Sequence, residues 1–172
     1  MFRRLGLVCS IALVIALLTW ANWPIDDLPS GARADRIVVV KSQRTLTLLR
    51  AGQPLRVYPV ALGRVPGGAK ERAGDRKTPE GLYRIVEHKR ASAFRRALRV
   101  SYPEDRDLAR AQRLGVDPGG DIMVHGLHNG LGWIGRLHRR FDWTAGCIAV
   151  TDHEIEEIYS ATGIGTSVLV KP

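Results

Sequence analysis

Two residues in the last third of the chain have the chemistry of a nucleophile and its base. Cys147 follows the run Thr144–Gly146, whose small residues permit a bend that comes close to a ligand. A thiol with a pKa of about 8.5 is mostly protonated at neutral pH, so it needs a base to become a nucleophile. We expect His125 to be that base, with the carbonyl of Gly126 fixing the tautomer of its ring.

Other interpretations of these residues stay open at this point. An unpaired cysteine is often only a small buried hydrophobic residue, and a histidine at a strand end is often structural. Three imidazoles and a thiolate, those of His125, His128, His138 and Cys147, also suit a zinc ion. The nucleophile prediction itself requires neither metal nor cofactor. A papain-like protease is disfavoured, because there the cysteine precedes the histidine along the chain.

The elements that must position this pair are short strands. Apolar and β-branched residues predict a β-rich α+β domain, a sandwich of short mixed strands with two short helices. The strands are expected at residues 37–40, 45–48, 55–62, 82–87, 98–102, 121–124, 148–150 and 167–170. The helices are expected at 104–114 and 151–161, the second begun by a capping box of Thr151 and Glu154. His125 thus follows one strand directly, and Cys147 precedes another.

A long segment at residues 63–81 is rich in glycine, proline and charge. It is either a solvated connector or a lid that lines the substrate, since loops of this length are often functional. No element is predicted for residues 89–97, which are basic and mixed in character. His88 and His153 are expected at the surface.

The N-terminus has the pattern of an export signal. Residues 1–21 contain Arg3 and Arg4 followed by an apolar run over residues 5–20, which is either cleaved after Ala21 or kept as a membrane anchor. Cys9 lies in this segment, and Val8 before it disfavours a lipoprotein signal. Residues 22–34 read as a linker, and 35–172 as one domain. We therefore expect a periplasmic or cell-envelope protein whose folded part has no disulfide.

The charge balance favours polyanionic surroundings. Lysine and arginine number 26 against 17 acidic residues, a formal charge of +9. No helical recognition motif, zinc-finger spacing or series of stacking aromatics points to nucleic acid. Export makes the polymers of the cell envelope the expected partners.

At these residues the chain resembles the L,D-transpeptidase catalytic domain, often called the YkuD family. His125-Gly126, a spacer, and then Thr144-Ala145-Gly146-Cys147 match the family's signature, and Thr78-Pro79-Glu80-Gly81 looks like its Thr-Pro-x-Gly turn. The resemblance covers residues 35–172. Ala145 stands where the family usually has histidine, and Ala149 where it has a polar residue. Residues 142–149 are similar to a murein transpeptidase-like branch, some of whose members cut bonds, and His138 is a candidate stand-in for the missing histidine.

The resemblance implies two-step acyl transfer on peptidoglycan tetrapeptide stems. Cys147 attacks, D-alanine leaves, and the amine of a second stem, a lysine of a peptidoglycan-linked lipoprotein, or water resolves the thioester. The enzyme is therefore a transferase or a hydrolase of cell-wall remodelling, and a wall-binding module without activity is the other alternative. The amides of Gly146 and Cys147 are the oxyanion candidates. The candidates for binding substrate are His138, Arg136, Arg139, Arg140 and Thr144.

Overall fold

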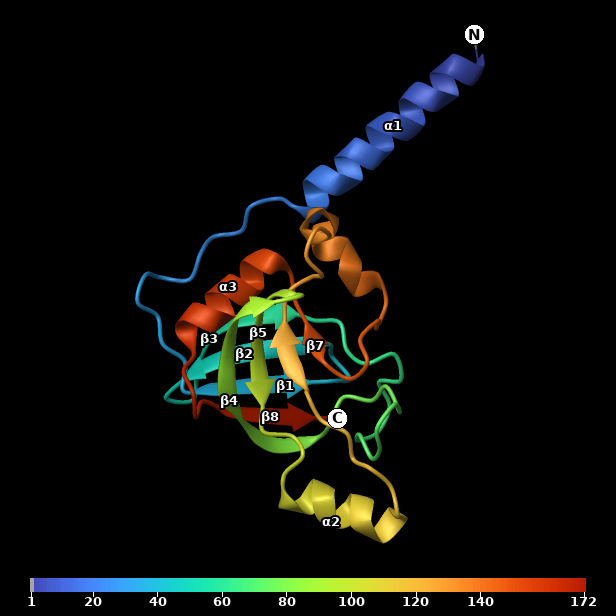
Figure 1. Ribbon diagram of the computed structural model, residues 1–172. Helices are drawn as coiled ribbons and strands as arrows, with labels where there is room; N and C mark the ends of the chain where they lie inside the picture. Colours follow the sequence, from blue (N-terminus) through green and yellow to red (C-terminus); the bar gives the residue numbers. More distant parts are fainter. Residues whose placement is uncertain (1) are drawn as a thin grey trace.

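The computed structural model describes residues 2–172. Met1 lies outside the described residues, as do the side chains of residues 2–6, which include the arginine pair of the expected export signal. Helix α1 (Phe2–Ala21) projects away from the rest of the molecule (Figure 1). None of the helices formed by residues 2–172 has the length and apolar character needed to cross a membrane. Export and cleavage stay predictions.

Residues 22–34 contain no helix or strand and lie along the C-terminal helix α3 (Asp152–Ala161). The Leu28 amide donates to Glu157 Oε1 across 2.6 Å, and the Ala34 amide donates to the Ala161 carbonyl across 2.7 Å. The expected linker is therefore hydrogen bonded to the domain at these two points.

The domain is built on one curled sheet of eight strands, in the order β3-β2-β1-β8-β4-β5-β6-β7. The strands are β1 (Arg36–Val40), β2 (Thr45–Arg50), β3 (Gln53–Pro59), β4 (Gly81–Ser92), β5 (Arg95–Val100), β6 (Met123–His125), β7 (Ile148–Ala149) and β8 (Ser167–Lys171). Pairing is antiparallel except for β1 with β8 and β6 with β7. The mixed β-rich fold expected from the sequence is confirmed.

Strand β4 allows the sheet to curl because it belongs to both halves. Its first residues, 81–84, pair with β8, and its later residues pair with β5. The two edges of the sheet then meet through bridges between Ala61 and Ala149 and between Gly63 and Thr144. Thr144 and Ala149 flank Cys147 in the sequence. Closure of the sheet therefore fixes the position of the turn at residues 144–147, which we call the cysteine turn.

The prediction for residues 89–97 was wrong. Strand β4 continues to Ser92, and β5 begins at Arg95. This hairpin carries charged side chains on its outer surface, such as Glu87 and Arg99, which form an ion pair at 2.7 Å. Few apolar residues remain in the segment, so hydrophobic alternation does not reveal the strands.

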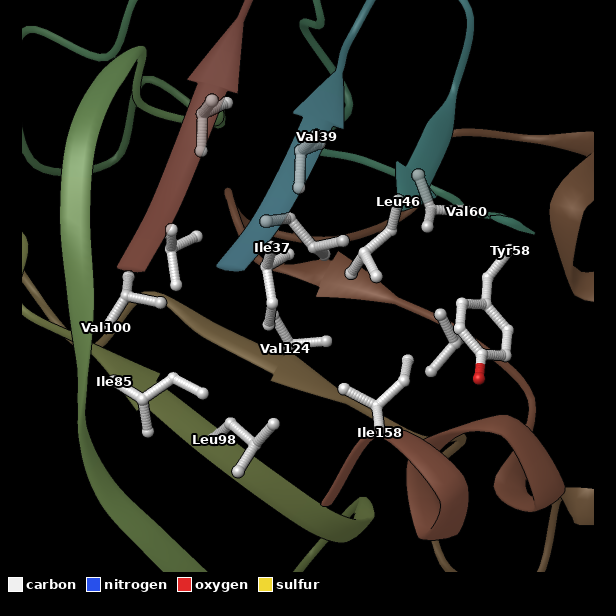
Figure 2. Packing of buried hydrophobic residues seen from close by; sticks show 14 of the residues in the cluster. Ile37, Val39, Leu46, Tyr58, Val60, Ile85, Leu98, Val100, Val124 and Ile158 are labelled. Atoms are coloured by element: carbon white, nitrogen blue, oxygen red, sulfur yellow. The ribbon is translucent and has the colours of Figure 1, made fainter. Parts of the chain in front are cut away.

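The core lies inside the curl and is made mainly of branched aliphatic side chains, with three tyrosines among them (Figure 2). Alternate residues of each strand point into it, as Leu46 and Leu48 of β2 do. Helix α3 covers one open side and adds Ile155 and Ile158, both fully buried. Each such side chain stabilises the fold by about 1.5–3 kcal/mol relative to exposure.

Helix α2 (Asp105–Leu114) and the 3-10 segment η1 (Gly132–Arg140) are the remaining helical elements of residues 2–172. Helix α2 ends at Gly115 in the left-handed conformation, and α3 begins with the predicted capping box of Thr151 and Glu154. The segment η1 lies between β6 and β7 and contacts α1. This segment was not predicted, since its glycines interrupt a helical pattern.

Candidate active site

Strand register places Cys147 and His125 on the same face of the sheet. In the parallel pair of β6 and β7, Val124 lies opposite Ile148, and His125 lies opposite Ala149. Val124 and Ile148 belong to the core, so the residues on either side of them face the opposite way. Cys147 directly precedes Ile148 and is therefore a diagonal neighbour of His125.

The His125 ring is held in one tautomer. The side chain is 3% exposed, and its Nδ1 lies 2.7 Å from the Gly126 carbonyl, as the sequence led us to expect. A carbonyl only accepts, so Nδ1 carries the proton and Nε2 keeps its lone pair. Burial lowers the pKa of His125, although the Gly126 bond opposes this. The ring is thus neutral and basic at Nε2.

Cys147 rests as a neutral thiol. Its side chain is half-buried, and Sγ donates to the Asp121 carbonyl across 3.6 Å. Burial raises the pKa of the Cys147 thiol, while a hydrogen bond from the Met123 amide lowers it. The raised pKa of the Cys147 thiol and the lowered pKa of the His125 imidazole both favour the uncharged forms of the two groups. A thiolate therefore forms only with proton transfer to a base.

Thr144 organises the turn that carries Cys147. Its buried hydroxyl donates to the Cys147 carbonyl across 2.8 Å and accepts from the Gly146 amide across 3.1 Å. The Thr144 hydroxyl is thus hydrogen bonded within the turn, and its role in binding substrate stays a prediction. The Gly146 amide is likewise engaged, which leaves the Cys147 amide as the oxyanion candidate.

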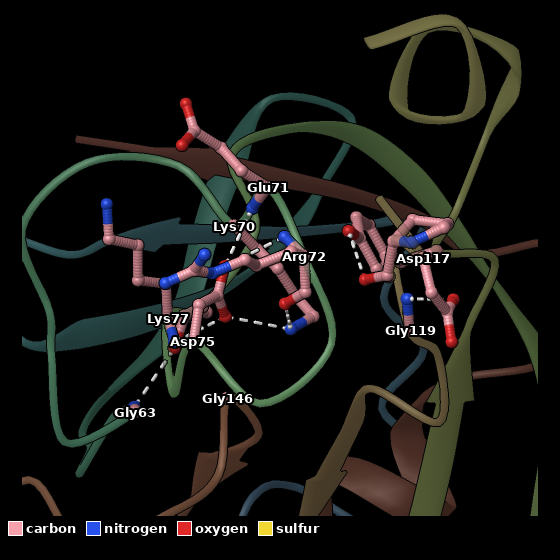
Figure 3. Close-up of polar contacts among 12 residues, drawn as sticks. Gly63, Lys70, Glu71, Arg72, Asp75, Lys77, Asp117, Gly119 and Gly146 are labelled. Carbon is pink, nitrogen blue, oxygen red and sulfur yellow. Dashed lines mark hydrogen bonds and ion pairs between the residues drawn. The ribbon is translucent and has the colours of Figure 1, made fainter. Parts of the chain in front are cut away.

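Gly146 is required by a close backbone approach. Its φ is +134°, and a Cβ built there would lie 2.7 Å from the Lys77 carbonyl. Lys77 belongs to the segment of residues 63–81, which we call the wall loop. Figure 3 shows Gly146 directly below this loop. The glycine thus lets the wall loop lie against the cysteine turn.

The wall loop has fixed internal bonding and is no solvated connector. Asp75 accepts from one side chain and three amides: Lys70 Nζ at 2.8 Å, Glu71 N at 2.8 Å, Arg72 N at 3.1 Å and Lys77 N at 3.0 Å (Figure 3). Burial opposes ionisation, yet these bonds lower the pKa of Asp75 to about 2. Buried Lys41 holds the other end through the carbonyls of Gly68 and Thr78.

Two aromatic rings enclose the imidazole and were missed from the sequence. The Phe94 ring centroid lies 4.4 Å from that of His125, and the Trp143 centroid lies 5.8 Å away. Trp143 directly precedes the cysteine turn in the sequence, and this position is the signal by which sequence reasoning could have found it. Phe94 lies in the unpredicted β4–β5 hairpin, so nothing nearby in the sequence connected it with the site.

His138 is hydrogen bonded to the site through Trp143. Trp143 Nε1 donates to His138 Nδ1 across 3.3 Å, so the His138 proton lies on Nε2, a buried atom without a hydrogen-bond partner among the described residues. Burial, then Arg139 and His125, lower the pKa of His138 to about 3. Ala145, where a histidine was expected from the resemblance, is exposed.

The three arginine candidates have different surroundings. Arg136 donates to the carbonyls of Trp20 and Trp23, so it is bonded to the end of α1 and the linker. Arg139 forms an ion pair with buried Glu154 of α3. Arg140 is exposed and remains the candidate for binding substrate carboxylates.

The structure does not bring the four residues of the zinc alternative together. Within residues 2–172, the group of His, Cys, Asp and Glu side chains with ligand atoms inside 4.8 Å of one another consists of Asp27, His153 and Glu157. The four proposed ligands are absent from it. His128 is exposed and lies beyond Phe94, and His138 is separated from the site by Trp143.

The two remaining histidines differ in exposure. His153 is exposed as expected, and its Nε2 lies 2.8 Å from Asp27. The prediction for His88 was wrong, because its ring packs 4.4 Å from the Tyr159 ring and its pKa is lowered by burial.

The chain resembles known proteins in sequence and in fold. The family model of the L,D-transpeptidase catalytic domain, YkuD, matches residues 34–170. No curated protein matches the chain. Among solved structures, the helical cell shape determining protein Pgp2 from Campylobacter jejuni is similar with a TM-score of 0.60 at 20% identity, over 91% of this chain and 55% of that one.

Two further structures share the fold. Bd1075 from Bdellovibrio bacteriovorus has a TM-score of 0.54 at 22% identity, over 83% of this chain and 50% of that one. L,D-transpeptidase 3 from Mycobacterium tuberculosis, in complex with a faropenem-derived adduct, has a TM-score of 0.54 at 18% identity, over 79% and 59%. The chain thus spans about half the length of these proteins.

Proposed function

Because this chain belongs to the L,D-transpeptidase catalytic domain family, YkuD, we propose that it is a cysteine acyltransferase acting on the tetrapeptide stems of peptidoglycan. The observation that carries the proposal is the placement of Cys147 diagonally from His125 on one face of parallel strands. The proton on His125 Nδ1 is held by the Gly126 carbonyl, which directs the basic Nε2 away from that bond.

The first step is acylation of the thiol. His125 Nε2 takes the Cys147 proton as Sγ attacks the carbonyl of the third residue of the stem. The Cys147 amide stabilises the oxyanion of the tetrahedral intermediate. When the intermediate collapses, His125 returns the proton to the leaving amine, so D-alanine departs and a thioester remains.

The second step resolves the thioester. An incoming amine gives its proton to His125 and takes the acyl group, which regenerates the thiol. Ala145 is exposed, and its small side chain leaves the solvent side of the turn open to the acceptor. The acceptor is the amine of another stem, a lipoprotein lysine or water, and each gives a different product.

The cellular role that follows is remodelling of the wall outside the cytoplasm. One structural neighbour, Pgp2, is described as a helical cell shape determining protein. We extend this to a proposal for this chain, in which residues 1–21 direct export and the catalytic domain acts on the wall that sets cell shape.

Faropenem tests the nucleophile, since a neighbouring structure holds a faropenem-derived adduct. We expect incubation of the full chain with faropenem to add mass at Cys147, located by peptide mapping. Cys9 is the matched control, because it is the other free cysteine and is exposed. Cys147→Ala should abolish the adduct and Cys9→Ala should retain it. An adduct that persists in Cys147→Ala contradicts the proposal.

Incubation with isolated sacculi tests the reaction. New cross-links between third residues indicate a stem acceptor, shortened stems indicate water, and freed lipoprotein indicates cutting of that linkage. Cys147→Ala should give none of these. An unchanged profile with the wild-type chain, whose thiol has been shown to be reduced, contradicts catalysis and favours a wall-binding module.

A further inference from the structure

The peptide bond that orients His125 has a carboxylate at its other end. Asp152 Oδ1 accepts from the Leu127 amide across 2.8 Å. That N–H and the Gly126 carbonyl belong to one peptide unit, and the carbonyl accepts from His125 Nδ1 across 2.7 Å. The atoms therefore form a chain from the Asp152 carboxylate, through a peptide group, to the imidazole.

We propose that Asp152 is a positioning residue that acts on His125 through the peptide between Gly126 and Leu127. This inference rests on the proposed function. A carboxylate bound to the N–H end of a peptide draws the N–H toward itself and increases the negative charge on the carbonyl oxygen. The carbonyl then binds the Nδ1 proton more strongly, which stabilises the imidazolium formed when Cys147 loses its proton.

The surroundings of Asp152 make room for this contact. A Cβ at Gly126 would lie 2.7 Å from Asp152 Oδ1, and a Cβ at Gly132 would lie 2.5 Å from Oδ2. The carboxylate thus lies between two glycines, at positions where a side chain would displace it. Asp152 is also the first residue of α3, a helix anchored in the core by Ile155 and Ile158, so its backbone is fixed.

Other charged groups near the imidazole are already paired or neutral. Arg95 and Arg96 of β5 both form ion pairs with Glu156 of α3. His138 of η1 is kept neutral by burial. Phe94 and Trp143 contribute only rings, and Cys147 is the proton donor itself. Asp152 is therefore the carboxylate connected to His125 by hydrogen bonds.

Asp152 also has an ordinary structural use, because acidic residues in the first turn stabilise a helix. The chain offers a matched control. Asp105 is the corresponding first residue of α2, exposed and in the first turn, so Asp105→Asn removes the same charge from the same helical position away from the site. If Asp152→Asn changes the reactivity of Cys147 and Asp105→Asn does not, the role of Asp152 in positioning His125 is separated from its role in stabilising a helix.

The test is the rate of Cys147 alkylation by iodoacetamide between pH 5 and 9, in the full chain, read by peptide mass spectrometry with Cys9 as the internal reference. The amide in Asp152→Asn retains an acceptor for Leu127 but loses the charge. We expect alkylation of Cys147 at pH 7 to slow by about fivefold, as loss of about 1 kcal/mol from a charge-assisted bond implies. The pH at which the rate rises should move upward.

Two further variants protect the test against a folding defect. Gly132→Ala keeps the charge but displaces the carboxylate, because Asp152 is the group that its Cβ would meet, and it should slow alkylation in the same direction. His125→Gln removes the base itself. Asp105→Asn should match the wild type in both rate and profile.

The outcomes distinguish this inference from the proposed function. If His125→Gln slows alkylation while Asp152→Asn and Gly132→Ala, both folded by circular dichroism, keep the wild-type profile, the relay through the peptide is wrong and the base assignment stands. If His125→Gln also leaves Cys147 as reactive as before, the proposed function fails with it. A slowing by Asp105→Asn equal to that of Asp152→Asn overturns the relay in favour of a general loss of charge.

Discussion

Trp143 Nε1 donates a hydrogen bond to His138 Nδ1 across 3.3 Å, and this contact fixes the tautomer of a buried histidine beside the site. The acceptor nitrogen must be unprotonated, so His138 is neutral when the bond exists. The side chain is 7% exposed, and burial is the main reason that its pKa falls to about 3.

His138 should make the fold sensitive to mild acid. In the unfolded chain it binds a proton below about pH 6.5, while in the folded chain it does so only near pH 3. Stability is therefore lost as the pH falls between these values, by up to about 1.4 kcal/mol per pH unit. From pH 7 to pH 5 we expect His138→Gln to lose about 2 kcal/mol less than the wild type in urea denaturation. Equal losses in both proteins contradict this.

Gly146→Ala should destabilise the cysteine turn. The new Cβ would lie 2.7 Å from the Lys77 carbonyl, at a φ of +134° that favours glycine. We expect a loss of about 2 kcal/mol or more in the free energy of unfolding. Gly67→Ala, in the same loop with open space around its Cβ position, should stay within about 0.5 kcal/mol of the wild type. Similar urea midpoints for the two variants would show that the close approach is unimportant.

Asp75→Asn should loosen the wall loop. The carboxylate ionises at a pKa of about 2 in the fold against 3.8 in the free state, so its contribution is present above pH 4 and lost as the pH falls through 2. This difference in pKa corresponds to about 2 kcal/mol in the free energy of unfolding at neutral pH. Trypsin should then cut within residues 63–81, which contain several basic residues. Asp105→Asn is the control. If Asp75→Asn resists trypsin as well as this control does, Asp75 does not hold the wall loop in place.

Neighbouring arginines should separate stability from substrate binding. Arg139→Ala leaves buried Glu154 without its ion-pair partner, and we expect a loss of about 3 kcal/mol in urea denaturation. Arg140→Ala, at an exposed position, should stay within about 0.5 kcal/mol of the wild type. If Arg140 binds stem carboxylates, that variant should instead raise the KM for tetrapeptide stems. The reverse pattern, with Arg140 alone affecting stability, would contradict these placements.

The local chemistry of the site was accessible from the sequence. A histidine followed by glycine led us to expect the bond from His125 Nδ1 to the Gly126 carbonyl, which depends only on adjacent residues. The capping box of Thr151 and Glu154 was predicted in the same way, because its partners lie three residues apart. The positions of Phe94 and Asp152 were not predicted, since both approach the His125 side of the site from distant parts of the chain, and for the wall loop a position lining the substrate was only one of two alternatives.

The sequence by itself determined the kind of chemistry available: one thiol in the folded domain, histidines before it, small residues around it, and the alternation that makes a β-rich domain. Only the tertiary structure decided which histidine shares a face with Cys147. The register of β6 against β7 sets that choice, and a shift of one residue would turn His125 into the core. Register depends on closure of the whole sheet, because side-chain packing and the bridges at Ala61 and Gly63 act over distances that no local pattern encodes.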